Sequence, residues 1–487
     1  MKHLSLFVCV FLFCAQSSAQ NNEFREEYDR FRNQSVKQYT SFRQKANSEY
    51  VEWMKTAWEQ HQALPIIPKP VDNDTPPVVY DNNNNDGEPI KNIQIPIEVV
   101  PSPIVRPQPL PIAPIQEVPD STPSICQFQF YGLNCKIRFD KSQHFSLPSL
   151  NNESIATQWD IMSDKFYDNT IRDCLEYRIK HNLCDWAYIQ FLEELAISVL
   201  PGKSEQNLLI AYLLCQTGYK IRLAKSENIL YFLYASPHYL YDLPTFKIDN
   251  VFYYGYNCAE TKLEIFNIPF PNEQLMSFWI PKSQQLGDKL SENRIISSKR
   301  YPELKVSVNV NTDLVEFFNT YPTSVIDDNL MTRWAMYANT PISRNIRENI
   351  YPQFRKLLGE NGQIESVNKI LNLIQTGLVY EYDDKVWGHD RAFFAEETLF
   401  YPYCDCEDRS ILFSRLVRDL LGLDVLLVFY PGHLATAVAF TENVSGDFIL
   451  YKDKKFVISD PTYIGAPVGM TMPEMNNKIA KVILLDK

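Results

Sequence analysis

The sequence predicts an α+β protein with more than one domain. Its 487 residues allow about three units at roughly 150 residues each. Apolar side chains recur at helical spacing in some segments and alternate at period two in others, with one long proline-rich stretch between them. Apolar residues make up 45% and charged residues 22%, which is the composition of a globular protein and argues against wholesale disorder.

The charge balance argues against nucleic acid as a partner. The chain carries 59 acidic and 47 basic residues, a formal net charge of −12, whereas phosphate-backbone binding depends mainly on Lys and Arg. After the first 20 residues no apolar run reaches the length of a membrane-spanning helix, so no transmembrane segment is predicted. These observations leave the oligomeric state open.

Residues 1–19 are typical of a secretory signal peptide. Lys2 precedes an apolar run from Leu4 to Phe13, and small and polar residues follow up to Ala19, where cleavage is expected. We therefore expect a secreted or periplasmic protein. A lipoprotein anchor at Cys14 is a weaker alternative, because Phe13 is bulky at a position that favours a small residue.

Removal of the signal leaves eight cysteines, too few over this length for a disulfide framework. An oxidising compartment would still allow local pairs. Cys126 with Cys135, or Cys174 with Cys184, are the two candidates, and the sequence does not decide between pairing and free thiols.

Residues 20–62 predict a long amphipathic helical arm, from Asn22 to about Gln62. Its aromatic stripe is expected to lie on the body of the protein and comprises Phe24, Tyr28, Phe31, Tyr39, Phe42, Ala46, Tyr50 and Trp53. Residues 63–125 follow as an extended connector, because 15 of the chain's 31 prolines fall between Pro65 and Pro123. Alternation from Ile93 to Val99 suggests that part of the connector lies along a surface.

Residues 126–300 predict a domain of mixed helices and strands. A strand begins near Cys126, helical segments cover about 152–200 and 207–216, and strands are expected at 229–234, 249–256 and 263–266. Residues 301–487 form a second unit, with a strand at 306–310 and helices at 351–358 and 364–375. Pro352 suits the first turn of the first of these helices.

Cys406 is expected in the first turn of a helix that ends at Gly422. Asp405 and Asp408 are spaced as an N-cap pair, and an apolar face follows. Unpaired N–H groups there favour a thiolate and donate to a developing oxyanion, but the dipole contributes only about 0.3–1 kcal/mol, and Glu407 opposes it. A reactive thiolate therefore needs a cationic partner.

The next segments supply an imidazole and a carboxylate. Residues 424–430 form an apolar strand, Pro431-Gly432 turns the chain, and His433 opens a second strand. His433 shares a face with Ala435, Ala437 and Ala439, which we expect to let the helix of Cys406 approach, while Leu434, Val438 and Phe440 face a core. Asp460 ends the strand 456–459, where it would orient the imidazole.

These residues resemble the transglutaminase-like superfamily, whose core is related to papain-type cysteine enzymes. The resemblance rests on Cys406-Glu-Asp-Arg-Ser, on Pro-Gly-His433 opening an Ala/Val strand, and on Asp460-Pro-Thr, and it covers about residues 305–487. It implies a helix packed on an antiparallel sheet, with Cys406 as nucleophile, His433 as general base and acid, and Asp460 as the orienting carboxylate. Cys404 departs from the small residue common at that position.

The expected function is that of a secreted cysteine peptidase, amidase or acyltransferase, a hydrolase or transferase that acts on polypeptide or cell-wall-like amides through an acyl-enzyme. Tyr401, Tyr403 and Trp387 are candidates for the oxyanion only by proximity. Arg409 is expected in an ion pair and His389 in a loop. No cofactor is predicted, and no metal site, because no paired His or Cys stands at ligand spacing.

Two alternatives remain. Cys404 and Cys406 would be a redox pair or an inhibitory disulfide, or the chain would be a non-catalytic exported protein that binds polypeptide or glycan and keeps a vestigial triad. A faint repeat bears on the first domain: residues 208–222 resemble 412–426, and aligning Gly218 with Gly422 places Gly202 where Cys406 stands. A first copy of the catalytic domain would therefore be inactive.

Overall fold

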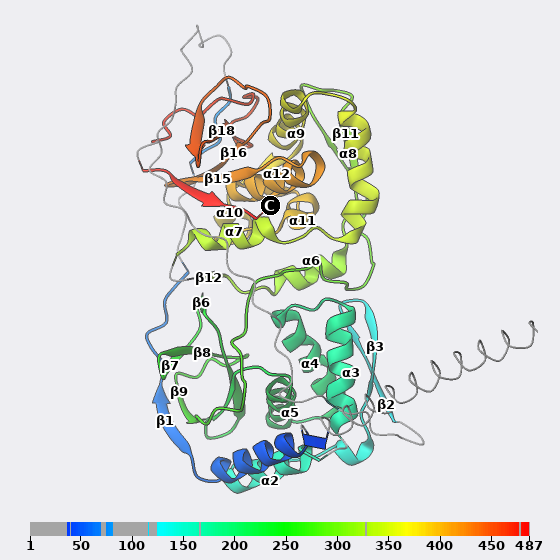
Figure 1. Ribbon diagram of the computed structural model, residues 1–487, viewed down its shortest axis with the longest axis vertical. Coiled ribbons are helices and arrows are strands. Elements are labelled where there is room, and N and C mark those ends of the chain that lie inside the picture. Colours follow the sequence, from blue (N-terminus) through cyan, green and yellow to red (C-terminus); the bar gives the residue numbers. More distant parts are fainter. Residues whose placement is uncertain are drawn as a thin grey trace, which may run out of the picture.

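The computed structural model describes residues 37–38, 40–69, 75–80, 115, 124–164, 167–326, 329–476 and 479–486, and its helices and sheets confirm the α+β class. Figure 1 shows two units, with β1–β9 and α2–α5 at the bottom and β15–β19 with α7–α12 at the top. The predicted signal peptide and the alternation at 93–99 lie outside the described residues. Among the described helices, none combines the length and the apolar character needed to cross a bilayer.

The predicted N-terminal helix ends earlier than expected and is turned about its axis. Within the described residues it covers 37–38 and 40–54, and strand β1 (Trp58–Gln62) replaces its expected end. Ala46 and Tyr50 are buried as predicted, but Phe42 is 47% and Trp53 57% exposed, and the buried face includes Met54 instead, which corrects the predicted stripe. The other stripe residues lie outside the described part.

The first unit packs four helices against a six-stranded antiparallel sheet. The helices are α2 (Asn152–Met162), α3 (Asp168–Lys180), α4 (Asp185–Val199) and α5 (Lys203–Gln216). The sheet order is β1-β9-β4-β5-β8-β7, with β4 (Ile221–Lys225), β5 (Leu230–Ala235), β7 (Thr245–Ile248), β8 (Val251–Gly255) and β9 (Lys262–Phe266). A hairpin of β2 (Ile125–Phe130) and β3 (Leu133–Arg138) and a short 3-10 turn, Lys141–Gln143, precede the helices.

The second unit is built around helix α12 (Cys406–Leu421) and a five-stranded antiparallel sheet. The sheet order is β17-β18-β16-β15-β19, with β15 (Val425–Tyr430), β16 (His433–Val438), β17 (Phe448–Tyr451), β18 (Lys454–Ser459) and β19 (Lys481–Leu484). The surrounding helices are α7 (Met331–Asn339), α8 (Tyr351–Leu358), which continues a π-helical turn Ile346–Ile350, α9 (Gln363–Gly377), α10 (Asp383–Val386) and α11 (Ala395–Phe400).

Short elements join the two units. Helix α6 (Thr312–Asn319) lies between them in Figure 1, and β6 (His238–Leu240) of the first unit pairs with β12 (Ser324–Ile326). Two further pairs are β10 (Arg294–Ser297) with β11 (Lys305–Val308), and β13 (Val379–Tyr380) with β14 (Tyr403–Cys404). One buried apolar cluster runs through both units.

The two main sheets share one topology. In each unit a helix leads into five strands whose spatial order is the same, β9-β4-β5-β8-β7 in the first and β19-β15-β16-β18-β17 in the second. The register agrees as well, because Val425↔Val438 and Ile221↔Tyr234 differ by 204 at both residues (425 − 221 and 438 − 234). Residues 406 and 433 thus correspond to Gly202 and Ile229.

The correspondence extends to the strand that precedes Asp460. Ala437 pairs with Ile458, and Leu233 (437 − 204) pairs with Gly255, so the shift on this strand is 203 (458 − 255). Asp460 then corresponds to Asn257. The first unit therefore has the same sheet without any of the three candidate catalytic side chains.

Candidate active site

Cys406 lies in the first turn of α12, as the sequence predicts. The Asp405 carboxylate accepts a hydrogen bond from the Asp408 N–H at 3.4 Å, and the Asp408 carboxylate accepts from the Asp405 N–H at 3.3 Å. This reciprocal cap fixes the start of the helix. Cys406 is only 2% exposed, so the thiol is closed to solvent in this conformation.

His433 and Asp460 form a buried pair. The Nε2 atom of His433, the first residue of β16, lies 2.8 Å from Oδ2 of Asp460, which directly follows β18. Their side chains are 0% and 2% exposed. Because β16 and β18 are antiparallel, the start of one meets the end of the other at the same edge of the sheet.

The helix that carries Cys406 begins at the same edge. The chain reverses after α12 into β15 and again into β16, so α12 and β16 run in the same direction. Ser410 donates to the carbonyl of Leu434 at 2.7 Å, and Cys406 lies one turn earlier, about 6 Å along the helix axis. This hydrogen bond holds the N-terminal part of α12 against the start of β16, the strand that opens with His433.

The thiol and the imidazole are not yet joined by a hydrogen bond. The Cys406 Sγ donates to Oε2 of Glu407 at 3.3 Å. Among the described residues the buried Nδ1 of His433 has no hydrogen-bond partner. The structure therefore unites His433 with Asp460 but does not join Cys406 to either of them. His433 stacks on Tyr430, which belongs to the apolar cluster on the face of the sheet opposite α12, so a productive contact with the thiol needs a rearrangement of this end of the sheet.

The packing of β16 differs from the predicted one. Leu434 and Val438 belong to the apolar cluster that contains α12, whereas Ala435, Ala437 and Ala439 belong to a separate cluster on the other face of the sheet. The alanines do not receive the helix, and the expectation that they do is wrong. Both faces of the sheet are buried, so the alternation of side chains along β16 did not show which face packs against α12.

A glutamine that the sequence analysis missed holds the loop after Asp460. Nε2 of Gln375, on α9, donates to the carbonyls of Asp460 at 2.9 Å and Ala466 at 3.1 Å, and its Oε1 accepts from the Gly465 N–H at 3.1 Å. The Asp460 Oδ1 also accepts from the N–H of Thr462 at 2.8 Å. These bonds fix the carboxylate that faces His433.

Cys404 is directed to partners other than Cys406. Its thiol lies 3.7 Å from the carbonyl of Val379 and accepts from Nε of Arg409 at 3.5 Å, and burial raises its pKa. None of the eight described cysteines forms a disulfide, so neither candidate local pair is formed. Arg409 is 1% exposed and donates to the Leu378 carbonyl, which corrects its expected ion pair.

The aromatic candidates for the oxyanion do not point at the sulfur. The Tyr401 hydroxyl donates to Oδ1 of Asn319 at 2.7 Å, and its ring packs edge-on against Trp387. Tyr403 is 41% exposed. His389 lies in an exposed loop, as expected, with Nδ1 at 3.0 Å from the Trp387 carbonyl.

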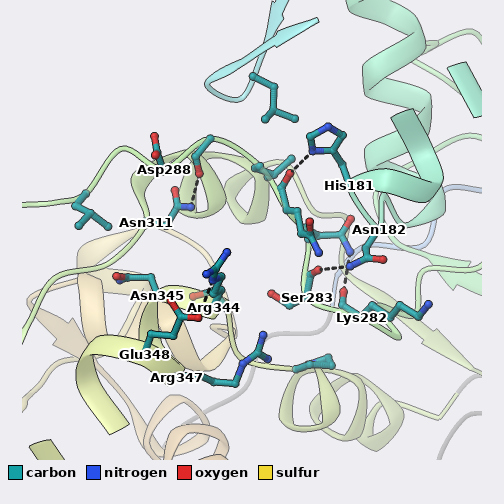
Figure 2. Close-up of a pocket in the computed structure, with 18 of the residues that line it drawn as sticks. His181, Asn182, Lys282, Ser283, Asp288, Asn311, Arg344, Asn345, Arg347 and Glu348 are labelled. Atoms are coloured by element: carbon teal, nitrogen blue, oxygen red, sulfur yellow. Dashed lines mark hydrogen bonds and ion pairs between the residues drawn. The ribbon is translucent and has the colours of Figure 1, made fainter. Parts of the chain in front are cut away.

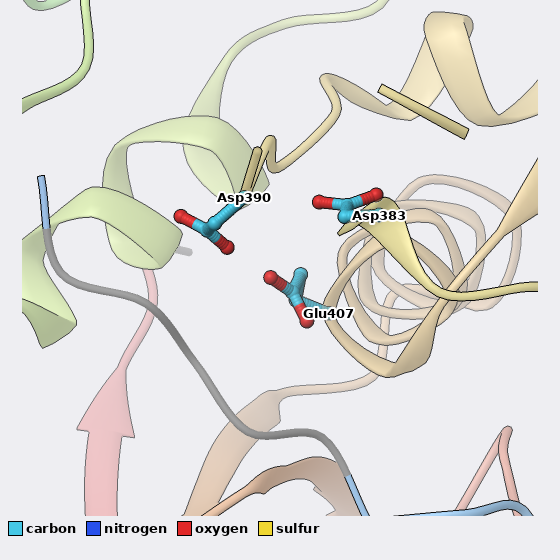
Figure 3. A group of neighbouring side chains, drawn as sticks. All are labelled: Asp383, Asp390 and Glu407. Atoms are coloured by element: carbon cyan, nitrogen blue, oxygen red, sulfur yellow. The ribbon is translucent and has the colours of Figure 1, made fainter. Parts of the chain in front are cut away.

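Buried carboxylates gather beside the start of α12. Figure 3 shows Asp383, Asp390 and Glu407 with their carboxylates turned toward one another, and oxygens of the three lie within 4.8 Å. Burial, and then the charge of Glu407, raise the pKa of Asp383 to about 8. Arg333 pairs with Asp390 at 2.5 Å and lies 4.0 Å from Glu407.

Such oxygen ligands suit a hard divalent cation. The sequence analysis predicted no metal site and missed this cluster, because its members come from α10, the following loop and α12. A second set of oxygens, from Asp383, Asp405 and Asp408, also lies within 4.8 Å. Burial and the charge of Asp383 raise the pKa of Asp408 well above its ordinary value. Protonation of the carboxyls therefore neutralises part of the negative charge of this cluster.

An open pocket of about 830 Å³ lies between the two units, away from Cys406, His433 and Asp460. Figure 2 shows His181 and Lys282 of the first unit on one side and Arg344 and Arg347 on another. Its lining is rich in polar side chains, and Arg344 pairs with Glu348 at 2.7 Å. None of the three predicted catalytic residues lines it.

No protein-family model, curated protein or solved structure matches this chain.

Proposed function

We propose that the protein is an exported thiol enzyme of the transglutaminase-like kind that cleaves or transfers amide bonds. Cys406 is the nucleophile, His433 the base and acid, and Asp460 the carboxylate that orients the imidazole. One observation carries the proposal: a buried His433–Asp460 pair leaves Nδ1 without a partner at the sheet edge where α12 begins with Cys406. A buried polar nitrogen without a partner is destabilising, which favours a functional reason for it.

The reaction begins when a rearrangement of this end of the sheet brings the thiol from Glu407 to the imidazole. Nδ1 of His433 takes the proton of Cys406, and Asp460 stabilises the resulting imidazolium through Nε2. The thiolate forms a bond to the carbonyl carbon of the substrate, and the carbonyl oxygen becomes an oxyanion near the N–H groups of the first turn of α12. The tetrahedral adduct then expels the amine, which takes the proton from Nδ1.

The second half of the reaction releases the acyl group. Water or an acceptor amine gives a proton to Nδ1 of His433 and attacks the thioester carbonyl, and the Cys406 sulfur leaves and recovers the proton. Water makes the enzyme a peptidase or amidase, and an amine makes it a cross-linking enzyme. For an exported protein we favour hydrolysis of peptides or cell-wall-like amides.

The first unit acts as an internal comparison. It has the same sheet topology, yet Gly202, Ile229 and Asn257 stand where the second unit has Cys406, His433 and Asp460. The shared fold therefore does not require these three side chains, and a chemical role accounts for their joint presence in one unit. This supports the earlier expectation that a first copy would be inactive.

The pH dependence of alkylation tests the proposal. In the intact chain, the iodoacetamide rate at Cys406, read by peptide mapping, should persist below the ordinary thiol pKa, because the thiolate is paired with an imidazolium. His433→Ala should move the profile toward the ordinary thiol value. Cys404→Ser is the matched control and should leave the profile unchanged.

Activity on a fluorogenic peptide completes the test. Cys406→Ala should abolish cleavage, and mass spectrometry should detect an acyl adduct on Cys406 in the unsubstituted protein. If the His433→Ala profile coincides with that of the unsubstituted protein and Cys406→Ala keeps its activity, the enzyme proposal is wrong.

The binding alternative has one observation in its favour, the open pocket between the units. Its polar lining would suit a polypeptide or glycan whose binding needs no chemistry. In that case Arg347→Ala would weaken binding, measured by calorimetry with peptide and glycan ligands, while Cys406→Ala would leave it unchanged. The two hypotheses thus predict opposite sensitivities for these two variants.

A further inference from the structure

A segment of the proline-rich connector lies against the edge of the candidate site. We call residues 75–80 the strap. The Thr75 N–H donates to the carbonyl of Gly432 at 2.7 Å, and Gly432 directly precedes His433. The Tyr80 N–H donates to the Ile464 carbonyl at 2.9 Å, four residues after Asp460. The strap therefore contacts the chain beside both members of the buried pair.

The strap pairs through its main chain with the loop that follows β18, in one isolated bridge. The Ile464 N–H donates to the Val78 carbonyl at 2.9 Å, and Val79 forms a parallel bridge with Ile464. Val78 and Tyr80 pack on a small apolar cluster of Tyr463, Ala466 and Met472, while Val79 points outward and is 67% exposed. Main-chain hydrogen bonds combined with alternate side chains in pockets are one recurring way in which proteins bind extended peptides.

The Tyr80 ring adds a specific contact. It packs edge-on against Tyr463 with a centroid distance of 5.5 Å. Such an aromatic pair stabilises more than its buried area alone, so Tyr80 is the main side-chain anchor of the strap. Tyr463 in turn lies three residues after Asp460, and its N–H donates to the Asp460 Oδ1 at 3.2 Å.

The connector is also anchored on the other side of the site. Nζ of Lys69 lies 3.8 Å from Oδ2 of Asp390, and it donates to the carbonyl of the same residue. Asp390 belongs to the carboxylate cluster that includes Glu407, the acceptor of the Cys406 thiol. The described parts of the connector thus touch the surroundings of all three candidate catalytic residues.

We propose that the strap occupies the edge on which an extended polypeptide substrate binds, at residues 462–464, and that it keeps the enzyme latent until it is displaced. This inference rests on the proposed function and adds to it a substrate class and a form of regulation. Cys406 is 2% exposed, so a substrate carbonyl reaches the sulfur only after a rearrangement, and we assign the displacement of the strap to that rearrangement.

The test loosens the strap in the full-length protein. In Val78→Ser/Tyr80→Ala, Cys406 should react with iodoacetamide at least about tenfold faster than in the unsubstituted chain, a difference of about 1.4 kcal/mol in the closing equilibrium. Val79→Ala is the matched control, because this side chain faces outward, and its rate should be unchanged. The partly exposed Cys126 gives an internal reference for reagent and pH.

A peptide competitor tests whether the strap stands in for substrate. A synthetic peptide with the sequence of residues 75–80 should restore slow labelling in the double variant, whereas a peptide of the same composition in scrambled order should not. Tyr80→Ala alone gives a milder change, and circular dichroism melting verifies that each variant is folded.

The outcomes separate the two proposals. Equal labelling in the double variant and the control, with peptide cleavage that still depends on His433, overturns the strap and leaves the enzyme. Faster labelling that the strap peptide does not suppress overturns the polypeptide-binding edge. Faster labelling without any effect of His433→Ala on the pH profile overturns the enzyme instead.

Discussion

Replacement of Asp383 by Asn should make the protein less sensitive to alkaline pH. The Asp383 carboxyl is buried beside Glu407 and Asp390, and its pKa is raised from an ordinary 3.8 to about 8. The folded state therefore holds the proton more tightly than the unfolded chain does. The stability that this group contributes is fully present below about pH 4 and is lost as the pH rises to about 8.

The size of the effect follows from the shift. An increase from 3.8 to about 8, at about 1.4 kcal/mol per unit, gives an upper limit of about 6 kcal/mol. The ionised Asp383 also raises the pKa of the neighbouring Asp408, so part of the effect is shared between the two groups, and we expect about half of that limit, near 3 kcal/mol. Asparagine keeps an oxygen for the Arg391 N–H, which lies 2.5 Å from Asp383 Oδ2, and it never ionises.

Chemical denaturation at pH 5, 7 and 9 measures the effect through intrinsic fluorescence. Relative to the unsubstituted protein, Asp383→Asn should gain about 2 kcal/mol between pH 5 and pH 9, because that range covers about three quarters of the titration. Asp384→Asn is the control, because Asp384 is exposed, and its difference should stay constant with pH. A pH-independent difference for Asp383→Asn would refute the reasoning, since it would show that no proton is held at this site.

Four further substitutions test the packing around the site, each by denaturation at neutral pH. Gln375→Ala should cost about 2–4 kcal/mol, because it leaves two carbonyls and one N–H of the Asp460 loop without their partner. Ser410→Ala should cost about 1–3 kcal/mol, and a smaller loss would mean that α12 is not fastened to β16 by this bond. Met54→Ala should cost about 2–5 kcal/mol, because this side chain of the N-terminal helix is fully buried in the core. Gly422→Ala should cost about 1 kcal/mol from its positive φ of 65° alone, since nothing lies near the added Cβ.

The elements around the candidate site could be predicted because their signals are local. The capping pair at Asp405 and Asp408, Gly422 at the helix end and the apolar run of β15 place α12, β15 and β16 within a residue or two. Helix α8 begins at Tyr351 and ends at Leu358, as predicted, with Pro352 in its first turn. In each case the neighbours in sequence determine the structure.

The N-terminal helix shows what local signals leave out. Its inward face includes Arg43 and Asn47, which amphipathic spacing assigns to solvent. Arg43 forms an ion pair with Asp168, and Asn47 accepts from the Trp159 indole at 3.2 Å. These partners lie more than 100 positions away in the chain, so only the tertiary structure shows that the polar side chains are paired inside.

The carboxylate cluster could not be predicted for a related reason. Asp383, Asp390 and Glu407 share no periodicity, and each is an ordinary polar residue of its own segment. Gln375 likewise lies on the helix α9, where a glutamine carries no functional signal. Strand β10 was missed as well, because the two isoleucines of Arg294–Ser297 are flanked by polar residues and form too short an apolar run to predict a strand.

The two units also differ in what their sheets enclose. The second unit buries an imidazole with an unpartnered nitrogen at the start of β16 and a thiol bonded to a carboxylate at the start of α12, and both are destabilising in a low-dielectric interior. The first unit has Gly202, Ile229 and Asn257 at the corresponding positions and forms the same strand order with the same register. The fold therefore forms without a buried thiol and imidazole at these positions, so folding stability does not explain why the second unit has them. The comparison of the two units therefore supports the proposed thiol chemistry, in which Cys406, His433 and Asp460 act together and the strap is the proposed cover of the site.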